Sequence, residues 1–136
     1  MTRPIEELVL VDTCIWAAFF KRSGGLTKQA LTHLLKRDRV AIVGPVVTEV
    51  LLGFRDTRHA EWVASLLDGV IHLTLDRSDW RNAATLGRTL ASHGHRLPLT
   101  DLVIASVCRR LQCPVFTIDP DFDHIEGINR FTANGL

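Results

Sequence analysis

The chain has 136 residues, of which 46% are hydrophobic and 23% charged, and its formal net charge of +1 indicates no class of partner by itself. This length suits a single domain over residues 1–136. No apolar run approaches the roughly 18 residues that span a bilayer, and no secretory signal pattern is visible, so we expect a cytoplasmic protein that does not bind membranes.

The first half of the chain alternates apolar runs with helical patterns. Residues 8–11 lack polar alternation, as expected for a strand buried on both faces of a parallel sheet. Asp12 can cap a helix that runs to Phe20, and residues 23–25 form a loop. The elements that follow are an amphipathic helix over 26–37, a strand over 40–43, and a helix that begins near Pro45, carries Glu49 and ends before Gly53.

The second half continues the alternation. It contains a helix over 58–67, a strand over 70–73, a helix over 78–92 closed by His93 and Gly94, a helix that ends at Leu111, and a strand over 113–118. Residues 128–131 are a candidate fifth strand. Strands that alternate with helices predict a doubly wound α/β domain with a sheet of four to five strands.

Four acidic residues stand where an apolar run meets a helix or a turn: Asp12, Glu49, Asp101 and Asp119. The carboxyl ends of parallel strands and the adjoining helix starts converge on one crevice, so we expect these carboxylates to gather there. Each alone has an ordinary explanation, such as a helix cap at Asp12, and Thr100 can cap the helix that carries Asp101. Glu49 lies in an almost wholly apolar stretch, which predicts its burial with a partner.

Gathered carboxylates favour a hard divalent cation. Two carboxylates about 4 Å apart repel by roughly 4 kcal/mol at an effective dielectric constant near 20, so an empty cluster takes up protons or metal. Carboxylate oxygens and water suit Mg²⁺ or Mn²⁺, whereas zinc usually recruits Cys or His. The histidines lack the H-E-x-x-H spacing, and the motifs of dinucleotide-binding proteins, P-loop proteins and serine hydrolases are missing from the sequence.

The three cysteines, Cys14, Cys108 and Cys113, have apolar neighbours and form no C-x-x-C pair. We interpret them as buried thiols and expect no disulfide framework. Cys14 stands two residues from Asp12, but its neighbours favour structural burial over a role as nucleophile.

Basic residues offer candidates for a rim that attracts phosphate. With the four acids set aside, 16 basic residues face 11 acidic ones. The candidates are residues 21–22, 36–39 and 109–110, with Arg55 and Arg58. Solvated helix ends are the commoner explanation for any one such pair.

Four segments in order resemble the PIN-domain nucleases, in particular the VapC-type toxins of bacterial toxin–antitoxin pairs. They are residues 11–16, 48–53, 99–105 and 117–122. Each motif alone is weak, whereas the ordered set is specific and covers almost the whole chain. The resemblance implies a PIN-like α/β/α sandwich with a central, mainly parallel sheet, and an endoribonuclease that uses Mg²⁺ or Mn²⁺. It also implies a small VapB-like antitoxin partner, a homodimer and a toxin–antitoxin hetero-oligomer.

By this resemblance the catalytic and metal-binding residues are Asp12, Glu49, Asp101 and Asp119, and the supporting residues are Thr13, Thr100, Thr117 and Asp121. Either Asp119 or Asp121 can supply the fourth carboxylate, and Glu49 or Asp119 can act as the general base. The number of metal ions, one or two, stays open. A bound cation would polarise the phosphodiester and activate water.

Two other functional classes compete with the nuclease. A receiver-like phosphoacceptor domain would pair its acids with a lysine near a late strand, but no lysine follows Lys36. A non-catalytic PIN-like interaction module with a degenerate metal site is the stronger competitor, although the complete set of four acids argues against degeneration.

Aromatic residues near the acids suggest how an antitoxin would bind. Trp16, Phe19, Phe20 and Phe54 flank two of the predicted acidic segments, and core packing should claim most of them. Any that stay exposed would border the pocket. An antitoxin helix in such a groove could extend an arginine toward the carboxylates and compete with metal.

Overall fold

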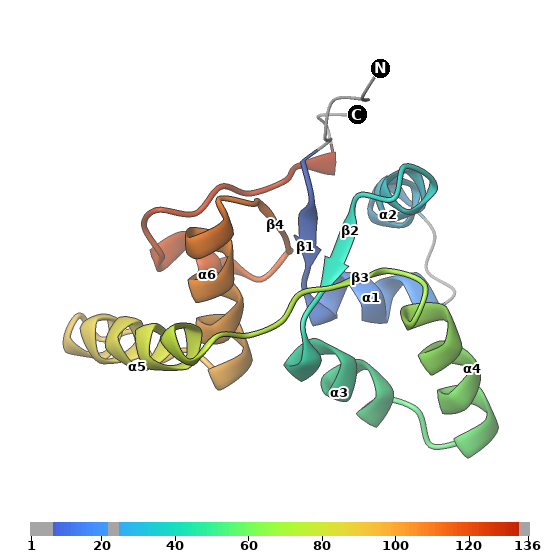
Figure 1. The fold of residues 1–136 in the computed structure, drawn as a ribbon, viewed down its shortest axis with the longest axis horizontal. Coiled ribbons are helices and arrows are strands. Elements are labelled where there is room, and N and C mark those ends of the chain that lie inside the picture. The colour runs from blue at the N-terminus through green and yellow to red at the C-terminus, as the bar shows by residue number, and fades with distance from the viewer. Residues whose placement is uncertain (1–6, 22–24, 134–136) are drawn as a thin grey trace.

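A parallel four-stranded sheet forms the centre of the fold. In the computed structural model, which describes residues 7–21 and 25–133, the strands are β1 (Val9–Val11), β2 (Val40–Ile42), β3 (Ile71–His72) and β4 (Val115–Phe116). Their order in the sheet is β3-β2-β1-β4, and β1 pairs with both β2 and β4 (Figure 1). This confirms the parallel α/β architecture.

Helices cover both faces of the sheet. They are α1 (Thr13–Phe20), α2 (Leu26–Lys36), α3 (Gly44–Leu52), α4 (Thr57–Leu67), α5 (Arg77–Ser92) and α6 (Leu99–Leu111), and a 3₁₀ helix, η1 (Pro120–His124), follows β4. The chain moves outward from β1 to β3 and then returns to β4. Because such crossovers are right-handed, the first four helices lie on one face and α5 and α6 on the other (Figure 1).

The strands are shorter than predicted. The run at 70–73 becomes the two-residue β3, whose side chains are exposed because it lies at the sheet edge with β2 as its strand partner. The candidate strand at 128–131 is wrong: only Arg130 forms a bridge, with Val115. Residues 23 and 24 of the predicted loop lie outside the described residues.

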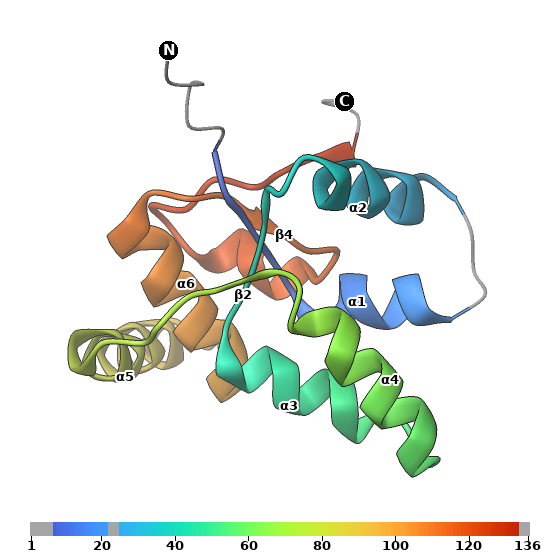
Figure 2. The same ribbon diagram turned by 45° about the vertical axis from the view of Figure 1, so that its right-hand side comes forward.

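The core surrounds β1. All three of its residues are buried, as predicted for a strand covered on both faces, and all three residues of β2 are buried too. Leu31 and Leu34 of α2 pack on one face and Ile104 of α6 on the other. Burying each such side chain stabilises the fold by about 1.5–3 kcal/mol. Figure 2 shows α1 and α3 starting directly from the ends of β1 and β2.

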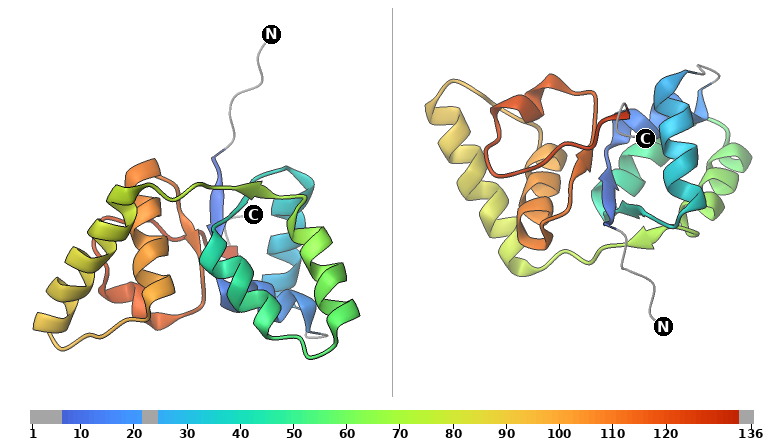
Figure 3. Two further views of the ribbon diagram at one scale, coloured as in Figure 1. Left: turned by 60° about the horizontal axis from the view of Figure 1, so that its bottom comes forward. Right: turned by 90° about the horizontal axis from the view of Figure 1, so that it is seen from above.

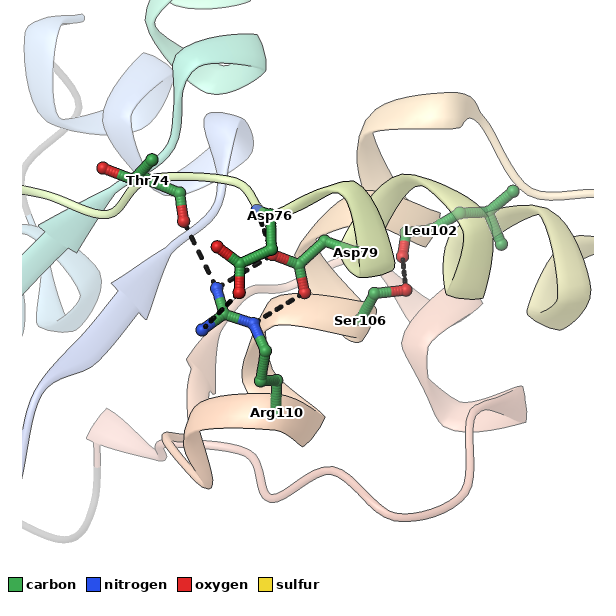
Figure 4. A network of polar contacts seen from close by, with 6 residues as sticks. All are labelled: Thr74, Asp76, Asp79, Leu102, Ser106 and Arg110. Carbon is green, nitrogen blue, oxygen red and sulfur yellow. Dashed lines mark hydrogen bonds and ion pairs between the residues drawn. The ribbon is translucent and has the colours of Figure 1, made fainter.

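An ion-pair network fastens α5 to α6. Asp79 in the first turn of α5 is fully buried, and both its oxygens accept hydrogen bonds from Arg110 of α6, at 2.9 and 2.8 Å. Arg110 also donates to the Thr74 carbonyl and pairs with Asp76 (Figure 4). Farther along, Gly87 allows close approach, because a Cβ there would lie 2.9 Å from a Leu102 methyl carbon.

Two views in Figure 3 place α5 at one edge of the molecule, alongside α6. Among the described residues, every helix is too short or too polar to cross a membrane.

Candidate metal centre

The predicted acids converge where β1 and β4 lie side by side. The strand order reverses at this point, since β1 leads to β2 on one side while β4 closes the other side. The carboxyl ends of two such strands leave a crevice between their outgoing loops, which is the usual ligand position in an open α/β sheet. Asp12 follows β1 directly, and Asp119 follows β4 after two residues.

Asp12 is held by three donors. It caps α1, with Oδ1 accepting a 2.7 Å hydrogen bond from the Thr13 backbone N–H. Its Oδ2 accepts a 2.8 Å bond from the Thr117 hydroxyl and a 3.5 Å contact from Cys14 Sγ. Burial raises the pKa of Asp12, and these hydrogen bonds act against that rise. The side chain is therefore fixed in orientation before any ligand binds.

Asp101 carries an unpartnered buried oxygen. The residue is 6% exposed in the first turn of α6, and among the described residues no hydrogen-bond donor reaches Oδ2. Burial and the charges of Asp12, Asp119, Asp121 and Glu49 raise its pKa to about 7. A buried acceptor without a donor is costly, and a cation would satisfy it.

Asp119 completes a three-carboxylate cluster. Oxygens of Asp12, Asp101 and Asp119 all lie within 4.8 Å of one another. Asp119 is anchored by its own backbone, since its N–H donates to the Thr117 hydroxyl at 3.0 Å. Asp121 has a different place: its backbone N–H donates to Asp119 Oδ1 at 2.9 Å, and it contributes negative charge from outside the cluster. The geometry therefore favours Asp119 over Asp121 as the carboxylate from this loop.

Glu49 is exposed, which corrects the expectation of burial. The helix α3 buries only the stripe formed by Val46 and Val50, so Glu49 and Leu52 face outward despite their apolar surroundings in sequence. Glu49 Oε1 accepts a 2.7 Å hydrogen bond from the Thr13 hydroxyl. The carboxylate thus stands at the rim of the site and is linked to Asp12 through Thr13.

Thr100 is not the cap of α6, contrary to expectation. The capping position belongs to Pro98, whose fixed extended backbone starts the helix without a side-chain hydrogen bond. Thr100 lies inside the first turn and is buried beside Asp101.

The acids line an open cleft of about 460 Å³. Three residues that were not predicted to belong to the site also line the cleft: Cys14, Leu52 and Pro98. The prediction of apolar surroundings for Cys14 is wrong, because its sulfur contacts Asp12 Oδ2 and the Thr117 hydroxyl. Burial raises the pKa of Cys14, which keeps the thiol protonated and argues against a nucleophile.

Several residues that were candidates for the basic rim lie away from the cleft or bind other groups. Residues 36–39 precede β2 and so lie at the amino edge of the sheet, opposite the cleft. Arg109 donates to the Glu126 carbonyl, and Arg110 belongs to the buried pair with Asp79. A hollow of about 530 Å³ between α5 and α6 includes both arginines but has no carboxylate in its lining.

The donor set fits a hard divalent cation. Three converging carboxylates, one with a buried unpartnered oxygen, offer the oxygen ligands that such ions prefer. Among the described residues, no histidine joins this group.

Comparison with known proteins assigns the family. The PIN-domain family model matches residues 9–128, which include the whole cluster. The chain belongs to the PIN-domain family. PIN nucleases generally use a divalent metal, in agreement with the acidic cluster.

Individual PIN-domain relatives cover nearly the whole chain. Ribonuclease VapC11 of Mycobacterium tuberculosis is 28% identical over 130 residues, which are 93% of this chain and 97% of VapC11. The VapBC-5 structure from M. tuberculosis has a TM-score of 0.65 at 26% identity, over 92% of this chain and 99% of that one. VapBC-1 from Haemophilus influenzae has a TM-score of 0.77 at 19% identity, over 93% and 98% of the two chains, and shows the shared fold.

Proposed function

We propose that this PIN domain is a metal-dependent endoribonuclease that acts as the toxin of a toxin–antitoxin pair. The observation that carries the proposal is the convergence of Asp12, Asp101 and Asp119, whose carboxylate oxygens lie within 4.8 Å of one another, together with the buried, unpartnered Oδ2 of Asp101. The 28% identity to ribonucleases over almost the full length supports RNA as the substrate. Mg²⁺ or Mn²⁺ is the proposed ion, since both accept oxygen ligands.

In this proposal Asp12, Asp101 and Asp119 hold the cation. When bound, the cation would polarise a phosphodiester and lower the pKa of a coordinated water. Thr117 fixes the orientation of Asp12, and Thr13 fixes that of Glu49, by hydrogen bonds of 2.8 and 2.7 Å. Supporting donors of this kind keep ligands in their productive geometry.

Glu49 is the proposed residue that orients or deprotonates the attacking water. It is exposed at the rim of the cleft, so water reaches it, and it stands outside the three-carboxylate cluster. Asp119 is less suited to this role, because its carboxylate lies in that cluster and caps η1. A general base must reach the nucleophile directly or through one water.

A small antitoxin is the proposed partner, because structural neighbours include complexes described as toxin–antitoxin systems. Half-buried Phe19, Phe20 and Phe54 and the exposed Trp62 form an aromatic surface over α1 and α4 that suits an amphipathic helix. The same proposal includes a homodimer and a hetero-oligomer with the antitoxin. It also places the protein in the cytoplasm, where it would encounter RNA.

A non-catalytic module would not need the arrangement of the acids. A degenerate site is expected to lose charge or convergence, whereas here the carboxylate of Asp101 stays buried among other acids at a cost to stability. We therefore favour the nuclease.

The test is cleavage of RNA by the purified protein. We expect cleavage with Mg²⁺ or Mn²⁺, its loss with EDTA, and its loss in an Asp12→Ala variant that still folds. Induced expression should arrest bacterial growth in the parent but not in the variant. Cleavage that persists in EDTA or in the variant would overturn the assignment of this site.

A further inference from the structure

The outer face of α5 carries a row of three arginines. Arg77, Arg81 and Arg88 are all exposed, and at 100° per residue they lie within about 40° of one another around the helix axis. The acid within α5 is Asp79, which is buried on the opposite side and paired with Arg110. Within α5, the charged side chains that are exposed to solvent are therefore all cationic.

These three guanidinium groups are available to a ligand. Among the described residues, Arg77, Arg81 and Arg88 have no hydrogen bond or ion pair through their side chains. By contrast, Arg109 and Arg130 donate to backbone carbonyls. The helix packs on α6 through its other side, which buries Ala83, Leu86 and Leu90, and Figure 3 shows α5 at the edge of the molecule.

The row starts at the end of α5 that leads to the metal centre. A six-residue connection joins α5 to α6, and its last residue, Pro98, lines the acidic cleft. Within this connection, His95 stacks on His124 of η1, with ring centroids 3.6 Å apart. The stack fastens the end of α5 to the segment that carries Asp119. From Arg88 to Arg77 the row then runs about 16 Å away from that end.

We propose that this arginine row binds the sugar–phosphate backbone of RNA next to the cleavage site. The inference rests on the proposed nuclease function and specifies where the substrate extends. The acidic cleft repels phosphate, so the energy of binding must come from elsewhere, and guanidinium groups match phosphate oxygens closely. Trp80 is 44% exposed on the same helix, three residues after Arg77 and so next to it on the helix surface, and offers a face on which an unpaired base can stack.

The test measures RNA binding in an Asp101→Asn background, which prevents cleavage. A labelled, unstructured RNA of about 16 nucleotides is titrated over a series of salt concentrations. Replacement of Arg77, Arg81 and Arg88 by Gln should weaken binding at least about tenfold near 50 mM salt. It should also lower the slope of log affinity against log salt by about 2, because each phosphate contact on a single strand contributes about 0.7. Replacing the three by Lys should retain most of the slope.

The matched control removes the same charge elsewhere. Lys36, Arg37 and Arg39 lie at the amino edge of the sheet, opposite the cleft, and their replacement by Gln should leave affinity and slope close to those of the parent. Circular dichroism checks that all variants are folded. Tryptophan fluorescence should change on RNA addition in the parent, and much less both in a Trp80→Phe variant and in the variant that lacks the row.

Outcomes for the row and for the nuclease are separable. In the cleaving protein, the row variant should cut an RNA of about 4 nucleotides like the parent but require more of the longer RNA to reach half-maximal rate. Three results would overturn RNA binding by the arginine row: unchanged affinity in the row variant, an equal loss of affinity in the control variant, or a parent that does not bind RNA in a salt-dependent way. The row would then have another ligand, for example an acidic protein partner. If the parent cleaves no RNA at all, the proposed nuclease function is wrong. The binding measurements would still test whether the arginine row binds RNA.

Discussion

The Thr117 hydroxyl donates a 2.8 Å hydrogen bond to Asp12 Oδ2 and so joins the end of β4 to the end of β1. The same hydroxyl accepts the Asp119 backbone N–H at 3.0 Å. One side chain thus positions two of the three clustered carboxylates. Because the hydroxyl is buried, water cannot readily replace it.

Thr117→Val should therefore lower the affinity for Mn²⁺ about 10- to 100-fold, the usual effect of losing a residue that orients a ligand. Valine keeps the shape but removes the hydroxyl. Isothermal titration calorimetry measures the affinity, and Thr117→Ser, which restores the hydroxyl, should recover most of it. Equal affinity in the valine variant would show that Asp12 needs no such support.

Asp101→Asn should abolish metal-dependent cleavage and stabilise the metal-free protein. The raised pKa of Asp101, about 7, means that the native state binds a proton more tightly than the unfolded chain does. The stability of the metal-free parent should consequently fall as pH rises from about 4 to 7, and the variant should lack that part of the loss. Urea unfolding in EDTA at about pH 5 and pH 8 measures the difference. A variant less stable than the parent at the higher pH would contradict the role assigned to Asp101.

Metal affinity should depend on pH through the same carboxylate. Below about pH 7 a cation must displace the proton from Asp101, so Mn²⁺ affinity should fall up to about tenfold for each further pH unit. Calorimetry in buffers of different ionisation enthalpy should detect release of about one proton near pH 6. If no proton is released there, Asp101 is already ionised in the metal-free protein.

The buried pair between Asp79 and Arg110 should contribute strongly to stability. Arg110→Met would leave the fully buried Asp79 charge unpaired, at a cost of about 3 kcal/mol. Arg110 lowers the pKa of Asp79, so this stabilisation is present above the unfolded pKa near 3.9 and is lost as pH falls through the lower native value. Urea unfolding at neutral and acid pH measures it. The double variant with Asp79→Asn should recover part of the loss, and additive losses would contradict direct coupling.

An antitoxin that places an arginine in the acidic cleft should compete with metal. Its guanidinium group would relieve the same repulsion between Asp12, Asp101 and Asp119 that a cation relieves. Mn²⁺ should therefore bind the complex more weakly than the free PIN domain, and an antitoxin variant without that arginine should restore the affinity. Unchanged affinity in the complex would leave steric blocking of RNA as the mechanism.

Much of this architecture follows from the sequence alone, because it depends on local patterns. The uninterrupted apolar run of β1 is buried on both faces as predicted, the predicted strand β2 is buried as well, and Asp12 caps α1. An acidic residue directly after such a buried parallel strand lies at the carboxyl edge of the sheet, because the backbone leaves the sheet there, at the switch point. The convergence of Asp12 and Asp119 was predictable for this reason, and that of Asp101 because helix starts adjoin the same edge of the sheet.

Only the tertiary structure decided which side of each helix is covered. Glu49 was expected to be buried because its neighbours are apolar, yet α3 packs through one stripe and leaves Glu49 at the rim. The Cys14 sulfur contacts the carboxylate of Asp12, its near neighbour in sequence, and the hydroxyl of Thr117, which is distant in sequence. Arg110 pairs with a buried aspartate, while the arginines of α5 are exposed to solvent. Sequence periodicity fixes which residues share a helix face, but the partner that packs against that face is chosen by long-range contacts.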